Sequence, residues 1–173
     1  MEGNSLTTIL GIDPGTAITG FGIIRAEGNR LQPVHYGAIL TSPQDSMPRR
    51  LQQIYQGISA IIAEYQPQTM AIEQLFFNKN VSTALTVGQA RGVAILAAAH
   101  GGLEIVEYTP LQVKQTVTGE GRAQKEQVAF MVKLLLGLQQ MPRPDDVTDA
   151  LAIAICHAHF NPVLTRINGR CQW

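Results

Sequence analysis

The sequence has few cysteines and no long hydrophobic run, and each shortage removes a class of protein. Its two cysteines, Cys156 and Cys171, follow no disulfide or zinc-binding spacing, so we expect a reducing, cytoplasmic environment. No stretch approaches the roughly 20 apolar residues that a membrane-spanning helix needs, and the first residues lack the basic and apolar segments of a signal peptide. We therefore expect no association with a membrane.

An excess of charge of either sign is also missing. The chain carries 13 basic and 13 acidic residues, and its formal net charge is zero. Proteins that bind duplex DNA usually carry a basic excess, so the total does not favour nucleic-acid binding. If several acids gather in one site to hold cations, however, the remaining surface is positive. DNA binding is therefore expected only together with such a site.

Repeats, low-complexity tracts and linkers are absent from the sequence. A length of 173 residues suits one domain with a full core and is short for two. We expect a single domain over residues 1–173, with residues 161–173 forming a C-terminal tail.

The hydrophobic periodicity predicts five strands and five helices in the order βββ-α-β-α-β-α-α-α. The strands are expected over Thr7–Asp13, Gly20–Ala26, Leu31–Leu40, Thr69–Glu73 and Glu104–Tyr108. The first helix is expected to carry an apolar face over Leu51–Tyr65, with Pro48 in its first turn. The others are expected from Asn80 or Ser82 to His100, and over Pro110–Thr118, Ala123–Leu136 and Pro144–His159. Asp45 or Ser46 can cap the first helix, and Pro67 ends it.

Short turns join the first three strands, which is typical of an antiparallel meander. The β/α units that follow predict a mixed five-stranded sheet of the α/β class with helices on both faces. Ligands of such sheets lie near the carboxyl ends of the parallel strands.

Acidic residues occur where two apolar strands end and where the last helix begins. Asp13 closes the first strand and Glu73 the fourth. In the last helix, Asp149 shares a face with either Asp146 or Asp145. Solvated strand ends and helix capping are the alternatives, but capping explains Asp149 poorly because it lies a turn inside the helix.

Carboxylates of this number suggest a hard cation with oxygen ligands, and Mg²⁺ fits because it also accepts waters and phosphate oxygens. Two such ions about 3.5–4 Å apart can hold the attacking water and the leaving oxygen of a phosphoryl displacement. The sequence therefore predicts a metal site that can support phosphoryl displacement.

Several segments resemble the RuvC family of Holliday junction resolvases, in the right order over residues 6–160. They read GIDPG, AIEQLFFNKN, GQARGVAILAAA, QVKQTVTG and DALAIAICHAH. The resemblance implies a ribonuclease H-like fold and a homodimeric, Mg²⁺-dependent crossover junction endodeoxyribonuclease. It implies paired symmetric nicks in four-way DNA junctions during recombination and repair, in partnership with a branch-migration helicase complex.

The resemblance also assigns the catalytic and metal-binding residues. The four acids of the family fall on Asp13, Glu73, Asp146 and Asp149, which leaves Asp145 as a helix cap. Two Mg²⁺ ions per active site are implied, with Mn²⁺ as an alternative.

Five residues are expected to contact DNA. Phe76 matches a family aromatic that stacks on junction bases, and Phe77 and Lys79 lie in the same loop. Lys114 and Lys125 match basic positions of the family and can meet phosphates. Core packing of the two phenylalanines and ordinary solvated lysines are the alternatives.

Other features allow more than one interpretation. Arg91 could touch DNA or pair across an interface, and the small-residue helix around it could be a dimer seam or be buried within one subunit. Cys156, His157 and His159 favour core packing or surface positions over zinc. Rival functions are an actin-like or sugar-kinase nucleotide-binding lobe, a non-catalytic junction-binding module, and another nuclease or transposase of the same fold.

Overall fold

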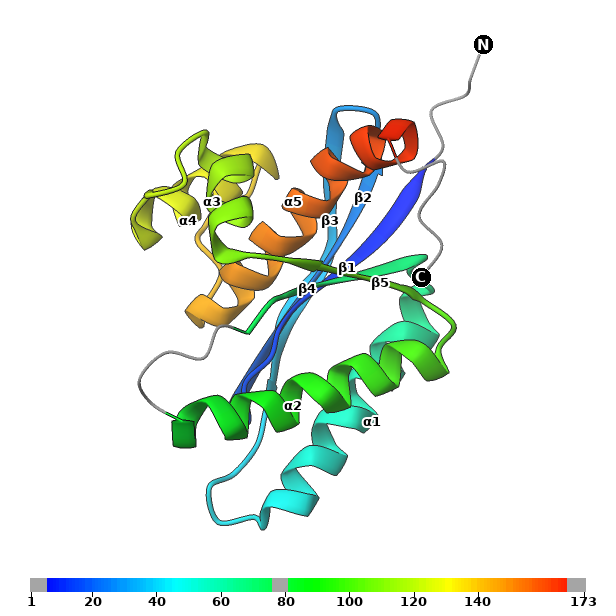
Figure 1. Cartoon of the computed structure of the whole chain (residues 1–173), viewed down its shortest axis with the longest axis vertical. Helices are drawn as coiled ribbons and strands as arrows, with labels where there is room; N and C mark the ends of the chain where they lie inside the picture. The colour runs from blue at the N-terminus through cyan, green and yellow to red at the C-terminus, as the bar shows by residue number, and fades with distance from the viewer. Residues whose placement is uncertain (1–5, 76–80, 168–173) are drawn as a thin grey trace.

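The computed structural model describes residues 6–75 and 81–167. Within these ranges, residues 81–83 and 161–167 are described by their backbone alone. The elements follow the predicted order (Figure 1). The strands are β1 (Thr7–Asp13), β2 (Ile18–Glu27), β3 (Arg30–Leu40), β4 (Thr69–Glu73) and β5 (Glu104–Tyr108). The helices are α1 (Met47–Tyr65), α2 (Val81–His100), α3 (Pro110–Thr118), α4 (Lys125–Leu135) and α5 (Asp145–Ile167).

The five strands form one mixed sheet in the order β3-β2-β1-β4-β5. The pairs β1–β2 and β2–β3 are antiparallel, whereas β1–β4 and β4–β5 are parallel. The predicted meander followed by β/α units is therefore confirmed. Strands β1 and β4 are direct neighbours, so their carboxyl ends meet at one edge of the sheet.

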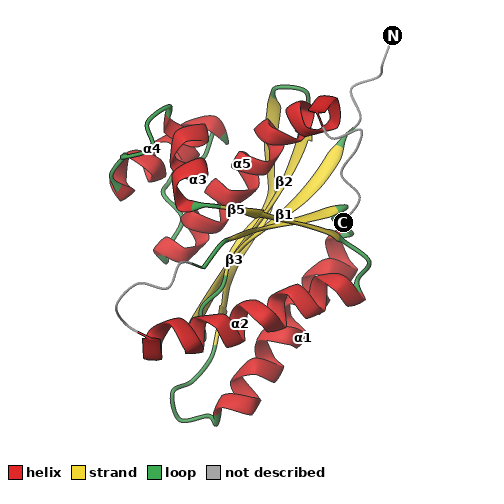
Figure 2. Ribbon diagram, viewed as in Figure 1, coloured by secondary structure: helices red, strands yellow, loops and turns green. Residues whose placement is uncertain are grey.

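Helices cover both faces of the sheet (Figure 2). Helix α5 crosses one face, with α3 and α4 packed beside it, and α1 and α2 cover the other face. Helix α5 lies directly on the backbone of β1 and β2. A Cβ atom added to Gly11 would be 2.1 Å from the Ala150 carbonyl oxygen, and one added to Gly20 would be 2.0 Å from that of Asp146.

Each face of the sheet has its own hydrophobic core, because side chains alternate between the faces along every strand. Ile9 of β1 and Ala71 of β4 belong to the core under α5. Leu10 and Ile12 of β1 and Met70 of β4 belong to the core under α1 and α2. The central strands are buried on both sides, which explains their continuous apolar runs.

Several element boundaries differ from the prediction, most of them by one residue, and three differ by more. Strand β2 begins at Ile18 rather than Gly20. Helix α4 begins at Lys125 rather than Ala123, because Gln124 occupies the N-cap position. Helix α5 continues past Pro162 to Ile167, beyond the expected end at His159. The domain limits and the tail stay a prediction, because residues 168–173 lie outside the described residues.

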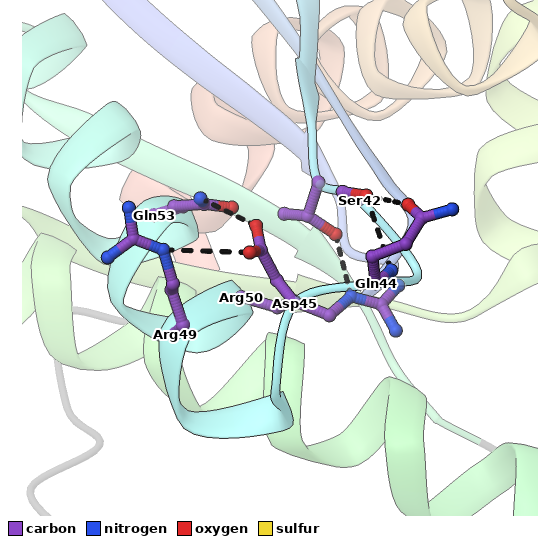
Figure 3. Close-up of polar contacts among 7 residues, drawn as sticks. Ser42, Gln44, Asp45, Arg49, Arg50 and Gln53 are labelled. Carbon is purple, nitrogen blue, oxygen red and sulfur yellow. Dashed lines mark hydrogen bonds and ion pairs between the residues drawn. The ribbon is translucent and has the colours of Figure 1, made fainter.

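The start of α1 is organised by Asp45 (Figure 3). Ser46 occupies the N-cap position but makes no side-chain capping hydrogen bond. The carboxylate of Asp45 instead accepts a hydrogen bond from Gln53 at 3.1 Å and pairs with Arg49 at 3.6 Å. Asp45 therefore braces the first turns of the helix without acting as its cap.

The same segment holds the turn that follows Asp13. Arg50 Nε of α1 donates to Thr41 Oγ1 at 2.8 Å. The Thr41 amide donates to the Ala17 carbonyl at 3.1 Å, and the Thr41 hydroxyl donates to the Thr16 carbonyl. The β1–β2 turn is therefore anchored to the body of the protein immediately after Asp13.

Candidate active site

Asp13 and Glu73 lie at the same end of the neighbouring strands β1 and β4. The parallel register pairs Ile12 with Ile72, so each acid follows directly after a matched pair. Since side chains alternate, both carboxylates are on the face that α5 covers. The partner of Asp13 on β2 is Gly20, on which the first turn of α5 rests. The predicted convergence of these two acids is thus what the strand pairing produces.

Helix α5 adds the other two predicted acids. A cavity of about 290 Å³ is lined by Asp13, Glu73 and Asp149, together with Lys114 and Lys125. Asp146 lies outside this lining, but its charge acts on both Asp13 and Asp149. The cavity therefore gathers carboxylates from two strands and one helix around one polar space.

The pKa of Asp13 reflects first its burial and then the neighbouring acids. Burial raises its pKa to about 7, and repulsion from Asp149, Asp146 and Glu73 acts in the same direction, opposed by Lys125. An acid with so high a pKa holds its charge poorly at neutral pH unless positive charge arrives. The site is therefore electrostatically prepared for a cation.

Glu73 and Asp149 are shifted in the same direction. Burial and then the charge of Asp149 raise the pKa of Glu73, while Lys114 lowers it. Burial also raises the pKa of Asp149, against the bond and the charge of Lys125, which lower it. Each of the two carboxylates thus has a basic neighbour that offsets part of the cost of burial.

Lys125 is the basic side chain in direct contact with the acids. Its Nζ atom lies 3.1 Å from Asp149 and 3.6 Å from Asp145. Asp145, expected as a cap, is the first residue of α5, and its carboxylate also pairs with Arg143 at 3.1 Å. Asp145 thus belongs to a peripheral ion-pair network, whereas Asp149 faces the cavity.

The donor set suits a hard divalent cation, because it consists of carboxylate oxygens. Among the described residues, no three carboxylate, imidazole or thiol side chains are grouped tightly enough to hold one ion as they stand. The charge of a bound ion would offset the repulsion among the carboxylates, which contributes to the raised pKa of Asp13. The residues present fit a divalent metal, and Asp13, Glu73, Asp146 and Asp149 would hold it.

The predicted DNA contacts fall into two groups. Lys114 and Lys125 both line the cavity beside the acids, so the structure brings them to the site. Phe76, Phe77 and Lys79 lie outside the described residues. Their roles stay a prediction.

Two side-chain contacts escaped the sequence analysis. Arg91 Nε donates to the Glu73 carbonyl oxygen at 3.2 Å, and its guanidinium also pairs with Glu107. In the core, the Tyr108 hydroxyl and His157 Nδ1 are 2.8 Å apart, and burial lowers the pKa of His157 to about 4. These contacts join residues that are distant in sequence, so no local sequence pattern predicts them.

The histidine and cysteine residues near the end of the last helix occupy core or surface positions, as the sequence predicts. Cys156 and His157 are buried in the core, and His159 is exposed. No helix in the described part of the chain is long and apolar enough to cross a membrane.

Comparison with known proteins gives concordant matches. The sequence model of the family described as "Crossover junction endodeoxyribonuclease RuvC" matches residues 9–157. The protein of that name from Desulforamulus reducens is 58% identical over 153 residues, which cover 88% of this chain and 94% of the relative. Its counterpart from Desulfitobacterium hafniense is 59% identical over 161 residues, covering 93% and 98%.

Solved structures agree. Thermus thermophilus RuvC in complex with a Holliday junction substrate superposes with a TM-score of 0.87 at 36% identity, covering 92% of this chain and 97% of that one. The yeast mitochondrial Holliday junction resolvase Ydc2 has a TM-score of 0.67 at 12% identity, which shows a shared fold.

Proposed function

This chain belongs to the RuvC family of crossover junction endodeoxyribonucleases, and on that premise we propose how its own residues cut a four-way DNA junction. The membership makes it a nuclease that depends on divalent metal. We propose Mg²⁺ as that metal, two ions per site, with Mn²⁺ as an alternative. The observation that carries the proposal is the gathering of Asp13, Glu73 and Asp149 around one cavity with two lysines.

Asp13, Glu73, Asp146 and Asp149 are the proposed metal ligands. Asp13 is central because the charges of the other three all act on it, so it is placed to serve both ions. Bound divalent ions supply a water of lowered pKa and neutralise the charge on the phosphate. The carboxylates fix where that water and the leaving oxygen lie relative to the scissile phosphorus.

The two cavity lysines are the proposed phosphate contacts. Lys125 pairs with Asp149 at 3.1 Å. With a divalent ion held by Asp149, the Lys125 ammonium group would be available to the negative charge on the phosphoryl oxygens. Lys114, whose charge acts on Glu73, also lines the cavity and is the second proposed phosphate contact. Phe76, Phe77 and Lys79 are proposed to stack on and hold the junction bases next to the cut.

A homodimer is proposed, with α2 as its seam. The exposed face of α2 carries no charged residue from Leu85 to Ala99, and an added Cβ at Gly92 would meet nothing within 4 Å. The side chains of Leu85 and Leu96 on this face are prominently exposed. A second copy would cover this stripe, and two-fold symmetry would present two active sites to equivalent strands of a junction. The same proposal includes a branch-migration helicase complex as partner and a cytoplasmic location.

The function is tested by cleavage of synthetic DNA. Purified protein is incubated with a labelled four-way junction or a plain duplex, with Mg²⁺ or with EDTA. We expect paired nicks in the junction with Mg²⁺ alone, and little cutting of the duplex. Asp13→Asn should lower cleavage at least about 1,000-fold while junction binding stays within about twofold, because a ligand is lost and not a DNA contact.

Asp45→Asn is the matched control, since it makes the same chemical change at the start of α1. This variant should cleave at the wild-type rate. Tight junction binding without any cleavage by the wild-type protein would favour a non-catalytic binding module. Equal loss of activity in both variants would mean that the site has been misplaced.

A further inference from the structure

Arg91 reaches the active-site end of the sheet from the face opposite the acids. It belongs to α2, and its side chain is 17% exposed. Its Nε donates to the main-chain carbonyl of Glu73 at 3.2 Å, while Nη2 donates to the carboxylate of Glu107 on β5. One guanidinium thus joins three elements, namely α2 and the adjacent strands β4 and β5. The planar fork of arginine suits such a double contact.

The carbonyl that Arg91 binds lies at the point where β4 leaves the sheet. The next amide, of Gln74, donates to the Tyr108 carbonyl at 2.8 Å. Leu75 lies within ordinary contact distance of a Cβ built on Gly88, one turn before Arg91 on α2. The main chain is therefore held at the Glu73 carbonyl and at the two residues that follow it. Because the side chain leaves from this backbone, the clamp fixes the position from which the Glu73 carboxylate extends.

We propose that Arg91 is a positioning residue for metal binding, which acts through the main chain of Glu73 while Glu107 orients its guanidinium. The inference rests on the proposed role of Glu73 as a metal ligand. It answers what the sequence left open for Arg91, because two of its guanidinium nitrogens, Nε and Nη2, are engaged within the chain. Removing the clamp would leave the ligand present but poorly placed, which raises the metal concentration needed to fill the site.

The test compares Arg91→Met, Arg91→Lys and wild type. Metal binding is read without DNA, as the Mn²⁺ concentration that gives half of the maximal rise in melting temperature and as the dissociation constant from calorimetry. We expect Arg91→Met to raise both about 10-fold. The Mn²⁺ concentration for half-maximal junction cleavage should rise in parallel. Junction affinity in EDTA should stay within about twofold of the wild-type value.

Arg91→Lys addresses the risk that the methionine variant does not fold. A single ammonium group can contact Glu107 or the Glu73 carbonyl but lacks the fork that reaches both, so an intermediate shift in metal binding is expected. Tyr55→Phe is the matched control for α2. It removes the hydrogen bond from Tyr55 to His100, 2.7 Å long, at the far end of the same helix. This control should lower thermal stability without moving the Mn²⁺ midpoint.

The outcomes separate the alternatives. A Mn²⁺ midpoint that moves no further in the Arg91 variants than in Tyr55→Phe would reduce Arg91 to a structural residue and overturn the proposal. Loss of junction binding in EDTA would overturn it in favour of a direct DNA contact. Failure of the proposed function appears separately, as wild-type protein that binds Mn²⁺ but leaves the junction uncut.

Discussion

At the scale of one residue, the fold raises the pKa of Asp13, and a bound cation would favour its charged form. The carboxyl group is buried and surrounded by three other acids, and its pKa is raised to about 7. In the unfolded chain the same group ionises near 3.8. The folded protein therefore holds a proton that the unfolded chain releases. The stability from this proton is full below pH 3.8 and is lost as the pH rises through about 7.

Asp13→Asn is expected to remove this pH dependence. In EDTA, the free energy of unfolding of wild type relative to the variant should fall by as much as about 4 kcal/mol between pH 4 and 8. Urea unfolding at several pH values measures the difference. His157, whose pKa is lowered to about 4, destabilises the fold as the pH falls, but both proteins carry it and its effect cancels. Parallel stability curves would contradict the assignment of a strained acidic group.

Single residues also mark the limit of sequence reasoning about the site. The strand-end positions of Asp13 and Glu73 indicated a shared site, because parallel neighbours end at one edge of a sheet. Spacing alone allowed Asp145 or Asp146 to accompany Asp149, and resemblance to a family was needed to choose. Neither spacing nor resemblance predicted the contact of Lys125 with Asp149 or that of Arg91 with Glu73. Each depends on how α4 and α2 pack against distant elements.

At the scale of elements, the periodicity predicted the strands β1, β4 and β5 and the helix α3 to the residue. Continuous apolar runs mark strands buried on both faces, and prolines mark the neighbouring ends. The other elements are present, but some of their ends differ where tertiary context decides. The first residues of β2 form a strand because β3 pairs with Ile18 and Thr19. Helix α5 continues through Pro162, beyond the predicted end at His159.

The close packing of α5 against the backbone of β2 gives a prediction at this scale. Gly20→Ala would place a methyl group 2.0 Å from the Asp146 carbonyl oxygen, so the first turn of α5 must move. We expect a loss of about 1–3 kcal/mol in the free energy of unfolding, as for an overpacked core. Cleavage per folded molecule should fall about 10-fold or more, because Asp146 and Asp149 move with the helix. Denaturant unfolding and single-turnover cleavage measure the two effects.

Gly37→Ala is the control for that experiment. It makes the same change in the edge strand β3, where the new methyl group meets only the ring of Phe21, at 3.1 Å. This variant should keep its cleavage rate whatever its stability. A normal rate in Gly20→Ala would show that the position of α5 tolerates displacement and would weaken the geometric argument for its acids.

At the scale of the whole molecule, the sheet separates two surfaces. The acids and lysines lie on the α5 side, whereas the uncharged stripe of α2 lies on the other. The zero net charge is consistent with this division, because acids gathered at the site leave basic residues for the rest of the surface. The total charge therefore says little about DNA binding until the fold shows where the acids lie.

Leu96→Glu is expected to dissociate the proposed dimer. A carboxylate in the middle of an apolar seam would be buried without a partner, which costs several kcal/mol. Light scattering should then report a monomer. On a plasmid with an extruded cruciform, the variant should yield nicked circles, whereas wild type yields linear DNA by paired nicks.

Leu134→Glu is the matched control, because Leu134 is similarly exposed on α4. It should stay dimeric and keep paired cleavage. The opposite pattern, with dissociation caused by Leu134→Glu and not by Leu96→Glu, would move the subunit interface to α4.

The clamp between α2 and the end of β4 carries a consequence for engineering. The helix that would meet a second subunit also holds the backbone of Glu73, a proposed metal ligand, so assembly and chemistry would not be independent. A redesign that rotates α2 to create a new pairing specificity, even with every acid untouched, would retune the ion requirement of the nuclease. Conversely, locking α2 with a better-packed interface offers a way to make the enzyme work at scarcer divalent ion.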